Sequence, residues 1–207
     1  MRIAEYGNGS HYRFAKPQSA IRNPQSVEVA GSVQTFKIIL TIFIVLLLQM
    51  LLPTYLSFFK YVDLPLVVTV YFGLQRAPML GMLTGTALGL GGDRVAGGIL
   101  GVGGFAKTLI GYLVAVASVR FALENPLARL AIMAVSSAAN TVLFIGLYLM
   151  LEQPLPEVAT YGALGRLVGW KTLGDTAAAV VLFIVLDRVF SEQAAARRMA
   201  IKKRFYE

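Results

Sequence analysis

The chain has 207 residues, of which 57% are hydrophobic and 14% are charged, against about 25% charged in an average soluble protein. Several apolar runs are long enough to cross a bilayer, so the composition excludes a sizeable soluble domain and predicts a polytopic membrane protein. There is no cysteine, which excludes disulfides, thiolate metal sites and thiol nucleophiles. The net charge of +8 gathers at the two ends and beside the apolar runs, a pattern typical of membrane topology and not of nucleic-acid binding.

Both ends of the chain are polar and basic. Residues 1–37 show no apolar periodicity, and we expect a mostly disordered cytoplasmic arm there and no cleavable signal peptide. Residues 191–207 form a second basic cytoplasmic tail. Both tails are expected to lie on anionic lipids of the cytoplasmic leaflet, at about 1 kcal/mol per Lys or Arg near the surface.

The intervening residues 38–190 contain six apolar segments. In chain order they run from Ile38 to Phe59, Leu64 to Leu74, Met79 to Gly92, Ile99 to Val119, Leu130 to Leu151, and from about Gly165 to Phe190. The first is interrupted only by Gln49 and Pro53, and Lys60 and Asp63 form a short turn after it. The second is short, at about 16 Å of helix against a hydrocarbon core of about 30 Å.

These segments predict an all-α integral membrane protein, a bundle of six transmembrane helices with a short second helix. Six spans place both basic ends on one side, together with the basic loops at Arg76 and at Arg120 and Arg129. The positive-inside rule therefore favours both termini in the cytoplasm. A re-entrant second segment would leave five spans and separate the two tails.

The third segment carries a glycine repeat. Gly81, Gly85 and Gly89 recur every four residues, and Pro78 separates this helix from the preceding one. Small residues at this spacing lie on one helix face and allow another helix to approach closely. We expect packing within the chain, with an intermolecular face as the alternative.

Ionisable and polar residues within or beside the apolar segments are the candidate functional residues. Charged side chains at membrane depth face a protein interior or a wet cavity and pair there. We expect Lys107 to pair with Asp93 or Asp175 across the bundle; the alternative is a lysine whose stem snorkels to the interface. Asn140 is expected to form an interhelical hydrogen bond, with a ligand contact as the alternative.

The sequence argues against catalysis. GVGGFAKT, residues 101–108, is close to a phosphate-binding loop, but Ala106 replaces its second glycine and the flanks are apolar helix, so we reject nucleotide binding. The single histidine, His11, lies in the polar arm, and no acidic pair has the spacing of a metal site or an aspartyl dyad. We therefore expect no enzyme, no cofactor and no metal.

Several short motifs, in order, resemble those of the MreD family. They are D-L-P-L at Asp63 to Leu66, R-x-P-x-x-G at Arg76, Pro78 and Gly81, the spacing of Gly85 and Gly89, Asp93, Gly97 with Gly98, Leu100-Gly101, and K-T-L-I-G-Y-L from Lys107 to Leu113. Each is degenerate alone, and their order and spacing carry the resemblance, which covers roughly Asp63 to Phe190. The long basic arm and the pair of Lys171 and Asp175 depart from the pattern.

The resemblance implies a non-enzymatic scaffold of the bacterial elongasome in the cytoplasmic membrane. It would bind MreC and support RodA and a class B penicillin-binding transpeptidase in peptidoglycan elongation and rod-shape maintenance, with the MreB cytoskeleton as an indirect partner.

The family also resembles the substrate-binding subunits of energy-coupling-factor vitamin transporters, which gives a rival function. Such a subunit would need an Ala-x-x-x-Ala type face on its first helix, and the first segment here has none. We therefore favour the scaffold. A flippase or channel would need polar residues lining several spans, and only Lys107, Asp175 and Asn140 are candidates.

Overall fold

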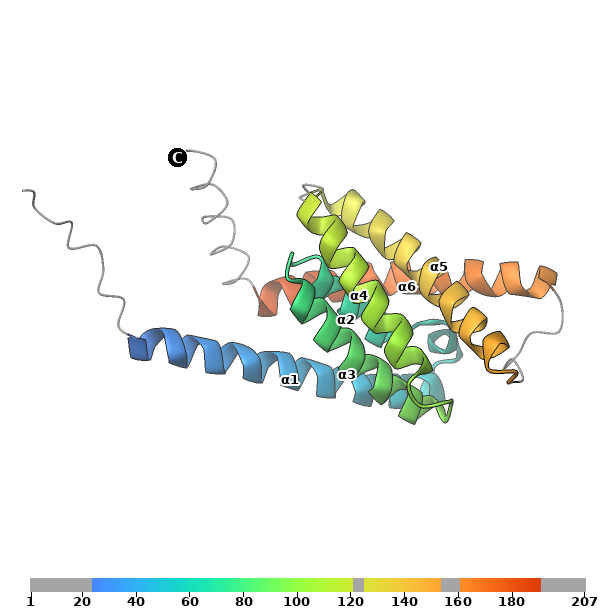
Figure 1. Ribbon diagram of the computed structural model, residues 1–207, viewed down its shortest axis with the longest axis horizontal. Helices are drawn as coiled ribbons and strands as arrows, with labels where there is room; N and C mark the ends of the chain where they lie inside the picture. Colours follow the sequence, from blue (N-terminus) through green and yellow to red (C-terminus); the bar gives the residue numbers. More distant parts are fainter. Residues whose placement is uncertain (1–23, 121–124, 154–160, 191–207) are drawn as a thin grey trace, which may run out of the picture. The chain divides into compact units, whose positions relative to one another are not determined.

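The computed structural model describes residues 24–120, 125–153 and 161–190, and within these every regular element is a helix, joined by short turns, with no strand. The helices are α1 (Pro24–Tyr55), the 3-10 helix η1 (Ser57–Tyr61), α2 (Leu64–Gly73), α3 (Pro78–Ala96), α4 (Val102–Arg120), α5 (Pro126–Met150) and α6 (Tyr161–Val189), as Figure 1 shows. The predicted all-α class is confirmed.

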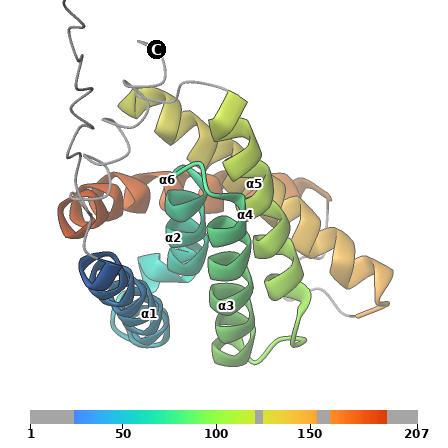
Figure 2. The same ribbon diagram turned by 60° about the vertical axis from the view of Figure 1, so that its left-hand side comes forward.

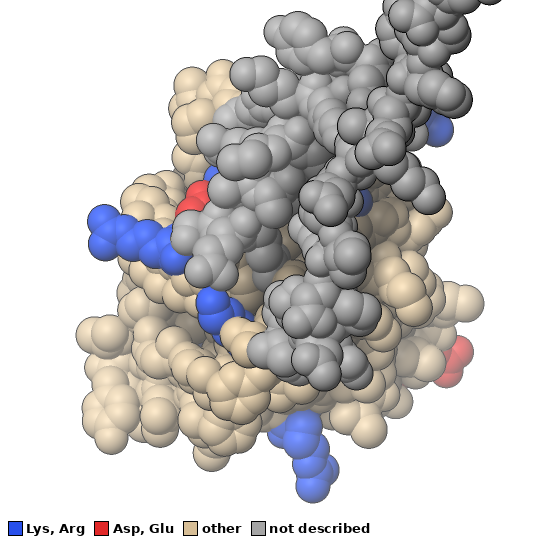
Figure 3. Space-filling model, turned by 90° about the vertical axis from the view of Figure 1, so that its left-hand side faces the viewer, with Lys and Arg blue, Asp and Glu red and all other residues tan. Residues whose placement is uncertain are grey.

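Three described helices are long and apolar enough to cross a membrane. They are the part of α1 from Val33 to Tyr55, α4 and α5, while α2 is a shorter apolar helix. The count of six spans stays a prediction. On the face shown in Figure 3, most of the described surface is uncharged, with a few Lys and Arg side chains and fewer acidic ones. Such a surface suits a lipid environment.

The first helix begins earlier than the apolar run does. α1 starts at Pro24, so residues 24–37 are helical, and the expectation of a disordered arm is wrong for them. Proline is favoured in the first helical turn, and adding residues to an existing helix costs far less than nucleating a new one. Residues 1–23 of that arm and the tail from 191 to 207 lie outside the described residues.

The chain divides into two compact units, residues 1–38 and 39–207. The second unit contains the C-terminal part of α1 and all the later helices. Every polar contact of the candidate site lies within this second unit.

A short helix forms the centre of the second unit. All ten residues of α2 are buried, and the helix contacts α3, α4, α5 and α6. Figure 2 shows α2, α3 and α4 side by side. α2 is about 15 Å long, half the thickness of the hydrocarbon core. Because the residues at both of its ends are buried, these ends lie within the protein interior. Its polar ends therefore need partners from other helices.

The glycine repeat of α3 packs against α4 backbone to backbone. A Cβ atom at Gly81 would lie 2.6 Å from the Gly111 carbonyl oxygen, and one at Gly85 would lie 2.5 Å from that of Lys107. One at Gly89 would lie 2.5 Å from the Gly103 carbonyl oxygen. No side chain fits at these distances, so α3 and α4 form a tight hairpin. Pro78 is the first residue of α3.

Candidate functional site

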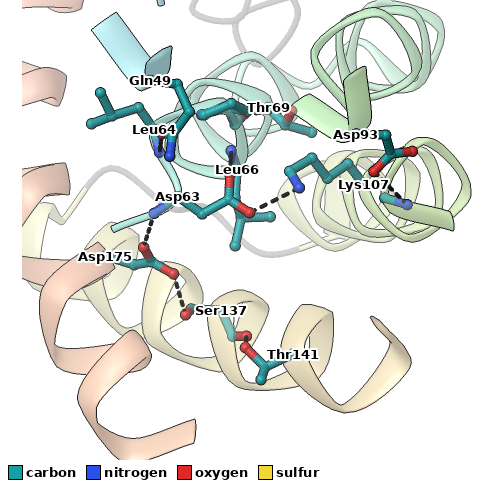
Figure 4. A network of polar contacts seen from close by, with 12 residues as sticks. Gln49, Asp63, Leu64, Leu66, Thr69, Asp93, Lys107, Ser137, Thr141 and Asp175 are labelled. Carbon is teal, nitrogen blue, oxygen red and sulfur yellow. Dashed lines mark hydrogen bonds and ion pairs between the residues drawn. The ribbon is translucent and has the colours of Figure 1, made fainter. Parts of the chain in front are cut away.

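A short extended segment between η1 and α2 is the core of a buried polar cluster, shown in Figure 4. Val62 and Asp63 leave helical geometry, with φ −108° and −101°. Non-helical backbone at membrane depth persists only where the protein satisfies its polar groups. The side-chain amide of Gln49 does this on one side, because its Nε2 donates to the Val62 carbonyl at 3.2 Å and its Oε1 accepts from the Leu64 N–H at 3.0 Å.

Asp175 binds the other side of the same segment. The backbone N–H of Asp63 donates to Asp175 Oδ1 at 2.7 Å, and the Ser137 hydroxyl donates to Asp175 Oδ2 at 2.5 Å. Asp175 is 1% exposed. Both oxygens of this buried carboxylate thus accept hydrogen bonds, one from the α2 entry and one from α5, so Asp175 joins three parts of the bundle.

Lys107 forms an ion pair with Asp63, with 2.8 Å between Nζ and Oδ2. The expected partners, Asp93 and Asp175, were wrong: Asp175 holds the backbone of Asp63, and Asp93 is committed elsewhere. The other carboxylate oxygen of Asp63 accepts from the Leu66 N–H at 3.0 Å and so caps the N-terminus of α2. The sequence did contain a signal, since an aspartate directly before Leu-Pro at the start of an apolar run is an N-cap pattern.

We call Gln49, Asp63, Lys107, Ser137 and Asp175 the Asp63 junction. Its hydrogen bonds and its ion pair join α1, α2, α4, α5 and α6 within the part of the chain that the structure describes. The sequence pointed to Lys107 and Asp175 but not to Asp63 as the residue that joins them. Gln49 stood out only as an interruption of the first apolar run.

Asp93 caps α4 from the end of α3. Its carboxylate accepts from the N–H groups of Gly101, Gly103 and Gly104 at 2.8, 3.0 and 3.2 Å. A carboxylate at a helix N-terminus satisfies orphan donors and is favoured by the helix dipole. These amides belong to the GVGGFAKT segment, so the donors that a phosphate-binding loop would offer to phosphate are bound to an internal aspartate. The geometry argues against nucleotide binding.

Asn140 does not make the expected interhelical bond through its carbonyl. Its Oδ1 is buried and accepts no hydrogen bond from the described residues. Ser137, three residues earlier on α5, makes the interhelical bond instead.

A second polar cluster, which the sequence did not predict, lies where α5 begins and α6 ends. The Arg129 guanidinium forms two hydrogen bonds to the Asp187 carboxylate, at 2.8 and 3.3 Å. It also lies 4.9 Å from the centroid of the Phe183 ring and 5.9 Å from that of Tyr71. We call these four residues the Arg129 junction. The sequence pattern predicted a loop at Arg129, but Arg129 lies within α5. One Arg and one Asp 58 residues apart carry no pairing signal in a sequence.

The polar groups of both junctions connect helices. Among the described residues no three His, Asp or Glu side chains lie together as a metal site would require. The carboxylates of Asp63, Asp93 and Asp175 accept backbone or side-chain donors through both oxygens. The arrangement therefore connects helix ends.

Comparison with known families identifies the chain. The model of a family described as rod shape-determining protein MreD matches residues 30–190. The chain belongs to the MreD family. No curated protein and no solved structure gave a match. The match starts at residue 30, so it includes the first apolar helix as well as the region from Asp63 onward that carries the motifs.

Membership of the MreD family connects the chain with determination of rod shape, and the apolar helices make it a multi-pass membrane protein. The fold also shows what two of the family-like motifs do. Asp63 of D-L-P-L and Lys107 of K-T-L-I-G-Y-L, 44 positions apart (107 − 63), form one ion pair.

Proposed function

We propose that this chain is a non-enzymatic scaffold of the elongasome. It binds MreC and supports the synthase formed by RodA and a class B penicillin-binding transpeptidase, in a bacterial cytoplasmic membrane, with six spans and both termini in the cytoplasm. Membership of the MreD family is the observation that carries this proposal. The polar groups of both junctions agree with a scaffold, because their hydrogen bonds and ion pairs connect helices.

The first helix is the strongest candidate for partner contact. Only 6% of the apolar window in Val33–Tyr55 is buried within the chain, compared with 56% for α4. Its exposed side chains are large and apolar, among them Phe43 at 59% and Met50 at 61%. A helix with so little internal packing offers its sides to lipid and to partner helices. We therefore assign lateral contact with MreC or the synthase to α1.

Site-specific photo-crosslinking tests this assignment in native membranes. A benzophenone amino acid at Phe43 should crosslink the chain to MreC, RodA or the transpeptidase. The same probe at Phe72, which is 0% exposed in the centre of the bundle, is the control and should yield no adduct with these partners. Adducts at Phe43 with lipid alone would contradict the role of α1.

Affinity purification in mild detergent tests the wider proposal. The tagged chain should co-purify with MreC, RodA and the transpeptidase. Recovery of a pair of ATPases with a membrane coupling subunit would instead favour a vitamin-transporter function.

A further inference from the structure

The central helix α2 is connected to α6 at two levels. At its start, the Asp63 N–H binds Asp175; near its end, the Tyr71 and Phe183 rings lie 5.7 Å apart between centroids. Each pair of positions is eight residues apart along its own segment (71 − 63 and 183 − 175). Eight residues of helix span about 12 Å, so α2 and α6 run in the same direction with contacts in register.

Each contact belongs to one of the two junctions. In the Asp63 junction, Asp175 of α6 accepts a hydrogen bond from Ser137 of α5. In the Arg129 junction, the guanidinium lies over the Phe183 ring and is paired with Asp187. A further ring contact, between Phe72 and Phe190 at 5.4 Å, reinforces the second level. The pair of α5 and α6 therefore meets α2 through polar or aromatic groups at both of its ends.

Between the junctions α2 has no room to deform. None of its ten residues is exposed. At its end a Cβ on Gly73 would lie 3.0 Å from the Gly111 carbonyl oxygen, and the Ser118 hydroxyl donates to the Gly73 carbonyl at 3.2 Å. A short helix held this closely by the α3–α4 hairpin moves as a rigid body, because packed interiors are not continuously deformable.

We propose that α2 couples the two junctions, so that loosening the Asp63 junction loosens the Arg129 junction at the opposite end of the helix, and the reverse. The bundle would then transmit a change along the length of α2, from one end of this buried helix to the other. This coupling is a property of the bundle itself and does not depend on which partner binds it.

Hydrogen exchange in nanodiscs tests the coupling directly. The reporters are the amides of residues 74–76, which bond back to α2 carbonyls beside the Arg129 junction. Asp175→Asn keeps the shape of the side chain and removes its charge at the far junction. We expect exchange at residues 74–76 to rise about fivefold or more, the low end of measured coupling between sites.

Two further variants make the result decisive. Ser137→Ala removes only one hydroxyl from the Asp63 junction and serves if Asp175→Asn does not accumulate. Thr86→Val is the matched control, because it also removes one interhelical hydroxyl contact, the 2.7 Å contact with Thr108, outside both junctions. We expect Ser137→Ala to raise exchange at residues 74–76 and Thr86→Val to leave it unchanged.

Coupling must also be reciprocal. Arg129→Gln should raise exchange at the Leu66 amide, which the Asp63 carboxylate holds at the start of α2. Faster exchange confined to the mutated junction would overturn the proposal. So would an equal rise in every helix, which would show general destabilisation.

Discussion

At the scale of single residues, buried charge is the dominant constraint. Lys107 is 6% exposed, and its ammonium lies against the Asp63 carboxylate. Removing one partner of such a pair leaves the other charge buried and unpaired, which costs about 3–5 kcal/mol, whereas replacing both is often neutral. The stability of a double variant therefore separates two cases. If the two residues form an ion pair, removing the second charge restores stability; if the lysine merely fills space, it does not.

We predict that Lys107→Met lowers the thermal unfolding temperature of the purified protein and its level in the membrane. The double variant Lys107→Met with Asp63→Asn should recover a substantial part of the loss, because no unpaired carboxylate remains, and Asn still accepts the Leu66 N–H as an N-cap. Arg94→Met, at an exposed position on α3, is the control and should have little effect. Equal stability of Lys107→Met and the unsubstituted protein would exclude a structural ion pair.

At the scale of helices, the glycine contacts decide how closely α3 and α4 approach. In lipid no hydrophobic force drives helices together, so close backbone contact supplies the association instead. The sequence predicted the glycine face but not its partner. Its partner is the backbone of α4, where the carbonyl groups of Lys107 and Gly111 face Gly85 and Gly81.

We predict that Gly85→Leu prevents accumulation of the protein, because overpacking typically costs about 1–3 kcal/mol and this site faces rigid backbone. Gly146→Leu on α5 is the matched control, since a Cβ at Gly146 meets nothing within 4 Å. Membrane levels of the two variants, measured by immunoblot, test this. Similar levels for both would count against tight packing of α3 on α4.

At the scale of the whole molecule, topology depends on the charge of the ends and loops. The positive-inside rule favours both basic ends in the cytoplasm. Both ends lie on one side only if the number of spans is even. The parallel direction of α2 and α6 agrees with six spans, in which even-numbered helices run the same way.

We predict that a fluorescent protein fused to either end folds and fluoresces, while alkaline phosphatase at either end stays inactive. Phosphatase fused in the loop after Met150, between α5 and α6, should be active as the reciprocal control. Activity at one end only would indicate five spans and a re-entrant α2.

The sequence by itself determined the class of the protein and the approximate place of each apolar helix, but not where α1 begins. Apolar length and glycine spacing are local patterns, and local patterns predict helices and their faces. The role of Asp93 was not among them, because it was expected to pair with Lys107 and instead caps α4 from within α3. Local patterns also carried the resemblance to the MreD family.

Only the tertiary structure decided which buried groups meet. Asp63 and Lys107, or Arg129 and Asp187, are far apart in the chain, and a carboxylate has the same local signature whichever cation it pairs with. Asp93 lay nearer to Lys107 in the sequence, yet the amides that open α4 bind it instead. Pairing follows from how helices pack in three dimensions, because a buried charge must take the partner that the packing brings within reach.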